Sequence, residues 1–259
     1  MKLASFIFIT AVFSAFAHAQ PSIFQGGVIN GASFAKGQAV APGGEVSVFG
    51  TGLATALIPG STIPLAANIG GTSVTFNGFS AGLYFVSDGQ LNVQLPWDVQ
   101  PGNATMVITS PSGASAPFQV QVTAAAPGVY SIPAGAGYAV AINADGSLAA
   151  PANAISGIAT HPAHVGDTLA VLATGLGAVT PSIANSAASL DALRNTVLTP
   201  VVLIGGQQAA VGFSGLAPQF PGINQVNVVV PGGTSGNSVP LQLQMNGITS
   251  TDQVVIAVQ

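Results

Sequence analysis

Two histidines three positions apart, His161 and His164, have the spacing in this chain that most resembles a site for chemistry. Two imidazoles at this spacing can share a metal ion, and the nearby Asp167 could supply a carboxylate. The segment precedes a predicted strand and contains Pro162, so a helix that would align the two rings is not expected. The chain also has no cysteine. We therefore predict solvated loop histidines, no metal site and no cofactor; a weak site loaded only at high metal concentration is the alternative.

Calcium is the second metal to consider. Residues 143–147 read Asn-Ala-Asp-Gly-Ser and place oxygen-bearing side chains at alternate positions. An EF-hand loop needs a bidentate glutamate at its twelfth position, where this chain has Ala154. A tight hairpin turn explains the same residues, because Asn, Asp and Gly tolerate its backbone angles. The pattern favours a turn without calcium.

Hydrolytic catalysis receives little support from the residues present. Apart from one histidine in the N-terminal segment, both histidines lie in one loop, which leaves a serine triad without a separately placed base. A glycosidase needs two carboxylates across a sugar. Asp88 and Asp98 bracket a predicted strand and are the only pair worth considering, whereas Glu45 and Asp167 precede equivalent strands and are typical of turns. We predict that the protein is not an enzyme, with a glycoside hydrolase as the weakest hypothesis.

Aromatic and amide side chains suggest a different chemistry, the binding of neutral sugars. Trp97 is the only tryptophan, and Tyr84 lies near the same end of the first predicted sandwich. An exposed aromatic face can stack on a sugar ring while the amides of Gln90 and Asn92 bond its hydroxyl groups. The favoured interpretation instead places Trp97 in the sandwich core. The Gln-x-Asn pair recurs in the second half of the chain, which favours a structural role, with amides bonding to loop backbone.

These side chains are positioned by a chain that repeats itself. Ile69 and Ile204 each begin an Ile-Gly-Gly motif, and they are 135 positions apart, as are the strands that begin at Gln90 and Gln225. An earlier shared Thr-Gly-Leu motif, at 51–53 and 174–176, is offset by 123 positions, so the second copy contains a 12-residue insertion. A repeat of about 100 residues matches one β-sandwich.

Strand patterns fill both halves of the chain. Residues 45–49 and 73–76 alternate between apolar and polar side chains, and Asn77-Gly78 predicts a hairpin whose second arm is 80–86. Residues 187–194 are the only credible helix. We predict an all-β fold of two tandem immunoglobulin-like β-sandwich modules, 20–126 and 127–259, the second beginning with a hairpin region at 127–160.

Composition and the N-terminus indicate the compartment. Only 4% of residues are charged and the net charge is −4, which excludes the basic surface that nucleic acids require. Residues 1–19 form a predicted signal peptide, with Lys2, an apolar run and the cleavage pattern Ala-His-Ala. We therefore predict a secreted protein with no membrane span after cleavage.

Several motifs, in order, carry a resemblance to a known family. They are residues 27–34 (GVINGASF), 41–53, 69–74, 86–97, 173–181 and 225–228. The chain resembles the Solibacter-type uncharacterised C-terminal repeat family of secreted acidobacterial proteins, whose modules are similar to IPT/TIG immunoglobulin-like domains. Gly82 and Asp88 stand where proline is expected in the family pattern. The resemblance implies a fold and a compartment but no reaction.

Three functions follow as hypotheses. The first is a secreted structural or adhesive module pair that binds an extracellular protein or polysaccharide, or associates with itself through exposed strand edges. The second is a carbohydrate-binding module that uses Trp97, Tyr84, Gln90 and Asn92. The third is the glycoside hydrolase considered above.

Overall fold

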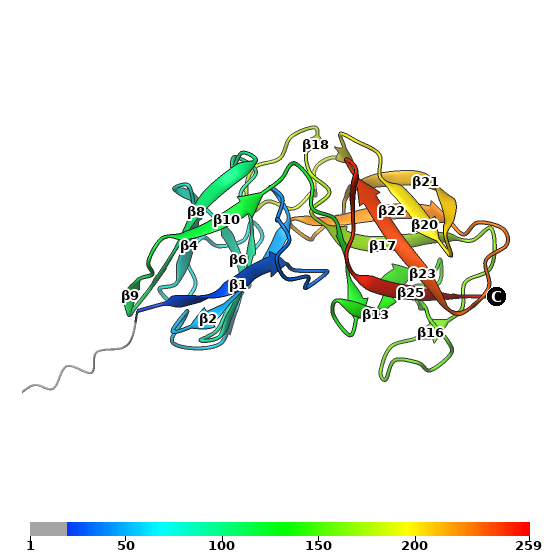
Figure 1. Ribbon diagram of the computed structural model, residues 1–259, viewed down its shortest axis with the longest axis horizontal. Helices are drawn as coiled ribbons and strands as arrows, with labels where there is room; N and C mark the ends of the chain where they lie inside the picture. Colours follow the sequence, from blue (N-terminus) through cyan, green and yellow to red (C-terminus); the bar gives the residue numbers. More distant parts are fainter. Residues whose placement is uncertain (1–19) are drawn as a thin grey trace, which may run out of the picture.

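The computed structural model describes residues 20–259, and this part of the chain is built from strands and loops without a helix. Figure 1 shows two β-sandwich modules side by side along the long axis, with the first module in blue to green and the second in green to red. The predicted all-β sandwich fold is confirmed. The signal peptide predicted for residues 1–19 lies outside the described residues. Between residues 20 and 259, no helix has the length and apolar character needed to cross a membrane.

The first module packs two antiparallel sheets around one core. Inward-facing residues alternate with partly exposed ones along the strands, as in Ser73–Phe76, because successive side chains of a strand point to opposite faces. Phe76, Leu83, Leu91 and Met106 are fully buried between the sheets. One sheet has the order β1 (Ser22–Asn30), β2 (Glu45–Thr51), β7 (Gln90–Gln94), β6 (Gly82–Val86) and β3 (Ile58–Pro59); the other has β10 (Phe118–Val122), β8 (Gly102–Ser110), β4 (Ser73–Phe76) and β5 (Phe79–Ser80), with β9 (Gly113–Ala114) beside β8.

The second module is one continuous hydrogen-bonded network of strands that folds over itself. Strand β21 pairs with β20 through its first residues and with β22 through the rest, with a register shift between Val211 and Phe213. Such a bulge lets one strand pass from one layer of a sandwich to the other. The network runs in the order β12 (Ser131–Ile132), β13 (Ala136–Ala139), β25 (Gln253–Val258), β23 (Gly236–Met245), β20 (Val201–Ile204), β21 (Gln207–Leu216), β22 (Ile223–Val229), β17 (Thr168–Thr174), β14 (Ala141–Ile142), β15 (Leu148–Ala149) and β16 (Thr160–His161), with β11 (Gly128–Val129), β18 (Val179–Thr180), β19 (Asn195–Thr196) and β24 (Ile248–Thr249) attached at its sides.

Each module has its own hydrophobic core. The first core includes residues from Val28 to Val122, and the second includes residues from Ala125 to Val258. The segment after Ala126 joins the second network, since β11 and β14 both pair with β17. The chain therefore passes from one core to the other within a few residues.

The Asn77-Gly78 turn forms as predicted, but its second arm is shorter than expected. Asn77 and Gly78 have φ angles of 49° and 85°, the positive values of a type I′ turn. The arm that pairs with β4 after this turn is only Phe79–Ser80, and from Gly82 the chain runs in the opposite sheet as β6. The continuous arm predicted at 80–86 is wrong. The chain crosses from one sheet to the other between Ser80 and Gly82, and Ala81 is buried at this crossing.

The helix predicted at 187–194 is also wrong. This segment is a loop in which the Arg194 guanidinium bonds to the Asp191 carboxylate at 2.7 Å and to the Ser182 carbonyl. Ser189 donates to the carbonyl of Ala192. An eight-residue helix is marginal in water without packing, so these side-chain contacts decide the local conformation.

Candidate functional site

The two modules meet at a buried polar cluster centred on Glu45, the first residue of β2. We call Glu45, Tyr84, Gln90, Asn92 and Tyr130 the junction cluster. The Glu45 carboxylate accepts hydrogen bonds from the Asn92 amide, at 2.8 Å, and from the Tyr130 hydroxyl of the second module. Glu45 is only 8% exposed, although the sequence placed it in a turn at a strand start. That expectation is corrected: this carboxylate belongs to the contact between the modules.

Burial keeps the two tyrosines of the cluster protonated. It raises the pKa of the Tyr130 phenol well above its usual value, and the nearby Glu45 carboxylate raises it further. The pKa of Tyr84 is raised by the same two causes, again with burial first. The Tyr130 phenol is a hydrogen-bond donor throughout the physiological range, and the Tyr84 hydroxyl is buried without a partner within residues 20–259. The neutral Tyr130 phenol therefore serves as a hydrogen-bond donor to the Glu45 carboxylate rather than as a proton carrier.

The main chain of Glu45 is held by the second module as well. Its backbone N–H donates to the Thr174 hydroxyl at 2.8 Å, and that hydroxyl donates to the Gly222 carbonyl at 2.7 Å. Thr174 is fully buried at the end of β17. It belongs to the Thr-Gly-Leu motif shared by the two halves. In the second module this motif therefore contributes a residue that bonds to the first module.

The amides of Gln90 and Asn92 form a side-chain ladder on the outer face of the first sheet. Gln90 donates to the Asn92 amide oxygen at 2.8 Å, and the Asn92 amide nitrogen in turn donates to the Glu45 carboxylate. Gln225 donates to Asn227 at the same distance in the second module. Bonds from these amides to loop backbone were expected, and that expectation is wrong. The recurrence reflects a ladder along one strand face instead.

Trp97 lies at the junction, outside the core of either module. Its backbone N–H donates to the Asn185 amide oxygen at 2.7 Å, and Asn185 donates to the Asp98 carboxylate at 2.6 Å. The half-buried indole packs over Gly43, where an added Cβ would lie 2.1 Å from ring atoms. The favoured core position is therefore wrong: the ring lies partly exposed at the junction and packs against the Gly43 backbone.

The insertion in the second copy supplies the other half of this contact. Ser186 donates its backbone N–H to the Gln94 amide oxygen at 2.6 Å and accepts from the backbone N–H of Leu65 at 2.9 Å. Figure 1 shows the yellow-green segment around β18 extending toward the first module. We call Asn185 and Ser186 the clip. Sequence reasoning missed both residues, although the extra length of the second copy was the signal that could have found them.

The histidines pair with separate aspartates. His161 Nε2 lies 3.0 Å from Asp145 Oδ2, and His164 Nδ1 lies 3.3 Å from Asp167 Oδ2. The Pro162 carbonyl and then Asp145 raise the pKa of His161, and the backbone N–H and hydroxyl of Ser147 are the main causes that lower the pKa of Asp145 to about 2. Within residues 20–259, no three His, Asp, Glu or Cys side chains converge as metal ligands would.

The carboxylate pair considered for a glycosidase does not share a cleft. Asp88 accepts a hydrogen bond from the Gly52 backbone N–H beyond one end of β7, and Asp98 bonds to Asn185 beyond the other end. A glycosidase holds its two carboxyl groups facing one another across the scissile bond. The structure assigns each of these aspartates to its own loop.

Comparisons with known proteins give distant structural likenesses. No protein-family model matches the chain, and no curated protein matches it, so the resemblance to the Solibacter-type repeat family stays a prediction. A Bacteroides ovatus protein, SGBP-B of a mixed-linkage glucan utilization locus, solved with a mixed-linkage heptasaccharide, superposes with a TM-score of 0.35 and 13% identity over 94% of this chain. The chain spans 46% of that protein's length.

Two further solved structures are similar at the same low level. The extracellular region of plexin A4 gives a TM-score of 0.29 and 11% identity over 92% of this chain and 18% of its own. Domains 5–6 of the S-layer protein SbsC give 0.28 and 12% identity over 93% of this chain and 99% of theirs. At these scores none of the three transfers a function to this chain.

Proposed function

We propose that this protein is a secreted, non-enzymatic module pair whose two sandwiches act outside the cell as one rigid structural or adhesive unit. The observation that carries the proposal is the burial of Glu45 between the modules, with a hydrogen-bond donor from each. A carboxylate taken out of water is costly unless it is hydrogen-bonded. Separation of the modules would leave Glu45 without its Tyr130 donor, so the docked arrangement is favoured.

The clip supports the same conclusion from another side of the junction. Asn185 and Ser186 make four hydrogen bonds to the first module, to the backbone of Trp97 and Leu65 and to the side chains of Asp98 and Gln94. Two modules joined only by a flexible linker would not form these four hydrogen bonds. Two contacts on different elements hold the relative orientation of the modules better than either alone. A unit of this kind can space or present a binding surface at a fixed angle.

Carbohydrate binding through Trp97 and Tyr84 is the second candidate function, and the geometry argues against that version of it. The Tyr84 hydroxyl is buried, and the Trp97 indole N–H is buried as well. The amides of Gln90 and Asn92 are engaged with one another and with Glu45. A sugar at this site would have to displace the hydrogen bonds that already engage these amides. We therefore place the binding of an extracellular polysaccharide or protein on another surface of the unit.

Paired spin labels test the rigid unit directly. The chain has no cysteine, so Ala114→Cys in β9 and Ser235→Cys in the second module give two exposed labelling sites without background. We expect a narrow distance distribution by double electron–electron resonance, and a broader one when Glu45→Ala and Asn185→Ala are added. A broad distribution in the parent pair would overturn the proposal. The same labels on the variant with Asn68→Ala, outside the junction, provide the control.

A further inference from the structure

The edge strand β1 contains a large bulge on the surface of the first module. Ile23 pairs with Gly50 and Val28 with Val48, so four residues of β1, Phe24 to Gly27, lie opposite the single residue Phe49. Gly26 takes a φ of 68° inside this bulge. A bulge at a sheet edge bends the strand and re-aims its side chains. Here it leaves the Phe24 ring 51% exposed.

The bulge forms one wall of an open groove of about 340 Å³. Small-ligand sites have volumes of about 300–1,000 Å³ and combine apolar walls with a few polar groups. The apolar lining comes from Phe24, Phe34, Phe49 and Ile29, and the polar side chains are those of Gln25 and Lys36. Phe34 and Phe49 pack against one another with ring centroids 6.2 Å apart. The groove is an aromatic site with an amide and an ammonium group at its rim.

The wall formed by Phe34 is held in a strained conformation. Phe34 has a φ of 53°, which is rare for a bulky residue and is maintained only where the surroundings determine it. Asn30 provides that support, because its side-chain oxygen accepts from the backbone N–H groups of Ala32 and Ser33 and its carbonyl accepts from Phe34 N–H. Asn30 also donates to the Ala126 carbonyl in the linker. The groove wall is therefore anchored to the junction.

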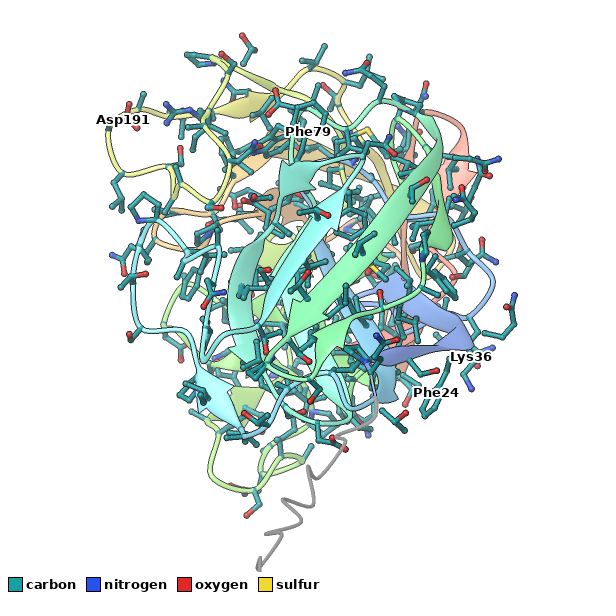
Figure 2. All side chains as sticks on the ribbon, turned by 90° about the vertical axis from the view of Figure 1, so that its left-hand side faces the viewer. Phe24, Lys36, Phe79 and Asp191 are labelled. Carbon is teal, nitrogen blue, oxygen red and sulfur yellow. The ribbon has the colours of Figure 1, made fainter. Side chains whose placement is uncertain are left out.

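The charge at the rim is unusual for this chain. Lys36 is the one lysine of residues 20–259, it is exposed, and no carboxylate in that part of the chain pairs with it. Arg194, by contrast, is neutralised by Asp191. Figure 2 shows Phe24 and Lys36 on the same corner of the first module, with Phe79 well away from them. An unpaired cation beside an exposed aromatic ring is complementary to a ring-shaped ligand that carries a carboxylate.

We propose that this groove binds the uronic acid residues of an acidic polysaccharide, with the sugar ring against Phe24 and its carboxylate against the Lys36 ammonium group. The apolar C–H face of a pyranose can pack on an aromatic ring, and the Gln25 amide can bond its hydroxyl groups. An added peptide strand is the less suitable occupant, because the bulge interrupts the regular ladder along which such a strand would pair. This inference goes beyond the rigid structural unit and does not depend on it.

Affinity electrophoresis of the full mature chain, residues 20–259, tests the site. The probes are polygalacturonate and, as an uncharged comparator, a neutral β-glucan. We expect retardation by polygalacturonate that is weakened about tenfold or more by Phe24→Ala, the change produced by losing about 1.4 kcal/mol of binding free energy. Lys36→Gln should weaken it as well, with the wild-type affinity falling as salt screens the ion pair. Phe79→Ala, at an exposed aromatic of the same module, should change nothing.

Three results would overturn the proposal. The first is a wild-type chain that polygalacturonate does not retard. The second is an equal loss for Phe79→Ala and Phe24→Ala, which would indicate non-specific adhesion. The third is retardation by polyglutamate as strong as by polygalacturonate, which would assign the groove to acidic peptides. Thermal unfolding of each variant must match the wild type, and Lys36→Gln, at an exposed position, keeps the test decisive if Phe24→Ala alters folding.

Discussion

The Tyr130 hydroxyl of the second module donates a hydrogen bond to the Glu45 carboxylate of the first, across 85 positions of sequence. Asn92 supplies the other donor from the first module, so the carboxylate is satisfied by both modules together. Removing one partner of a buried charged group leaves that group with its desolvation cost uncompensated. The stability of each module is therefore linked to its contact with the other.

The first prediction concerns this bond. Tyr130→Phe keeps the ring and removes the donor, so we expect the free energy of unfolding to fall by about 1–3 kcal/mol. Urea denaturation followed by circular dichroism measures the change. Tyr138→Phe, in β13 of the second module, is the matched control, because Tyr138 is a partly buried tyrosine that is not among the five residues of the junction cluster. An equal effect of the two substitutions would contradict the role given to Tyr130.

The second prediction uses Trp97 as a reporter, since it is the only tryptophan. Asn185→Ala removes the acceptor for the Trp97 backbone N–H and the donor to Asp98. We expect a red shift of the Trp97 fluorescence emission and stronger quenching by acrylamide. Without these two hydrogen bonds the clip no longer covers the half-buried indole, which becomes more exposed to water. Asn68→Ala, which removes only a local turn bond to Gly71, should leave the spectrum unchanged. Unchanged quenching in Asn185→Ala would show that the clip does not hold the ring.

The third prediction concerns Asp252, whose carboxylate accepts from the Val129 backbone N–H at 2.5 Å. Burial raises the pKa of this group, and its second oxygen has no partner within residues 20–259. A raised folded-state pKa means that its stabilising contribution is complete below the unfolded pKa, about 3.9, and is lost as the pH rises through the folded value. The amide side chain of the Asp252→Asn variant does not ionise, so the variant does not lose this contribution. The difference between the melting temperatures, variant minus wild type, should therefore increase between pH 4 and pH 8. A constant difference across that range would rule out this linkage.

The fourth prediction concerns the His161 imidazole. The carbonyl of Pro162 and the carboxylate of Asp145 raise its pKa, so Asp145→Asn should lower the pKa while the Pro162 contact keeps it above the usual value. A titration of the imidazole resonances by NMR gives the result. Asp191→Asn, whose carboxylate pairs with Arg194, should leave the His161 titration unchanged. An unchanged His161 pKa in Asp145→Asn would show that the Asp145 carboxylate does not raise it.

Local patterns predicted much of the architecture. Apolar alternation in segments such as Ser73–Phe76 indicates strands because the side-chain period of a strand is two, and Asn77-Gly78 adopts the positive φ angles that its residue types allow. The Asp-Gly turn also forms, with the Asn143 N–H donating to the Ser147 carbonyl at 2.8 Å. These features depend on neighbours in sequence. They follow from the chain itself.

What the sequence by itself determined is the all-β class, the repeat and the 12-residue insertion, because each is written in residue type and spacing. Only the tertiary structure decided that Trp97 leaves the core, that Glu45 is buried, and that Asn185 and Tyr130 reach them from the second module. The physical reason is that these partners are 85 to 88 positions apart, and their burial depends on how the modules dock. No local period in the sequence records that docking.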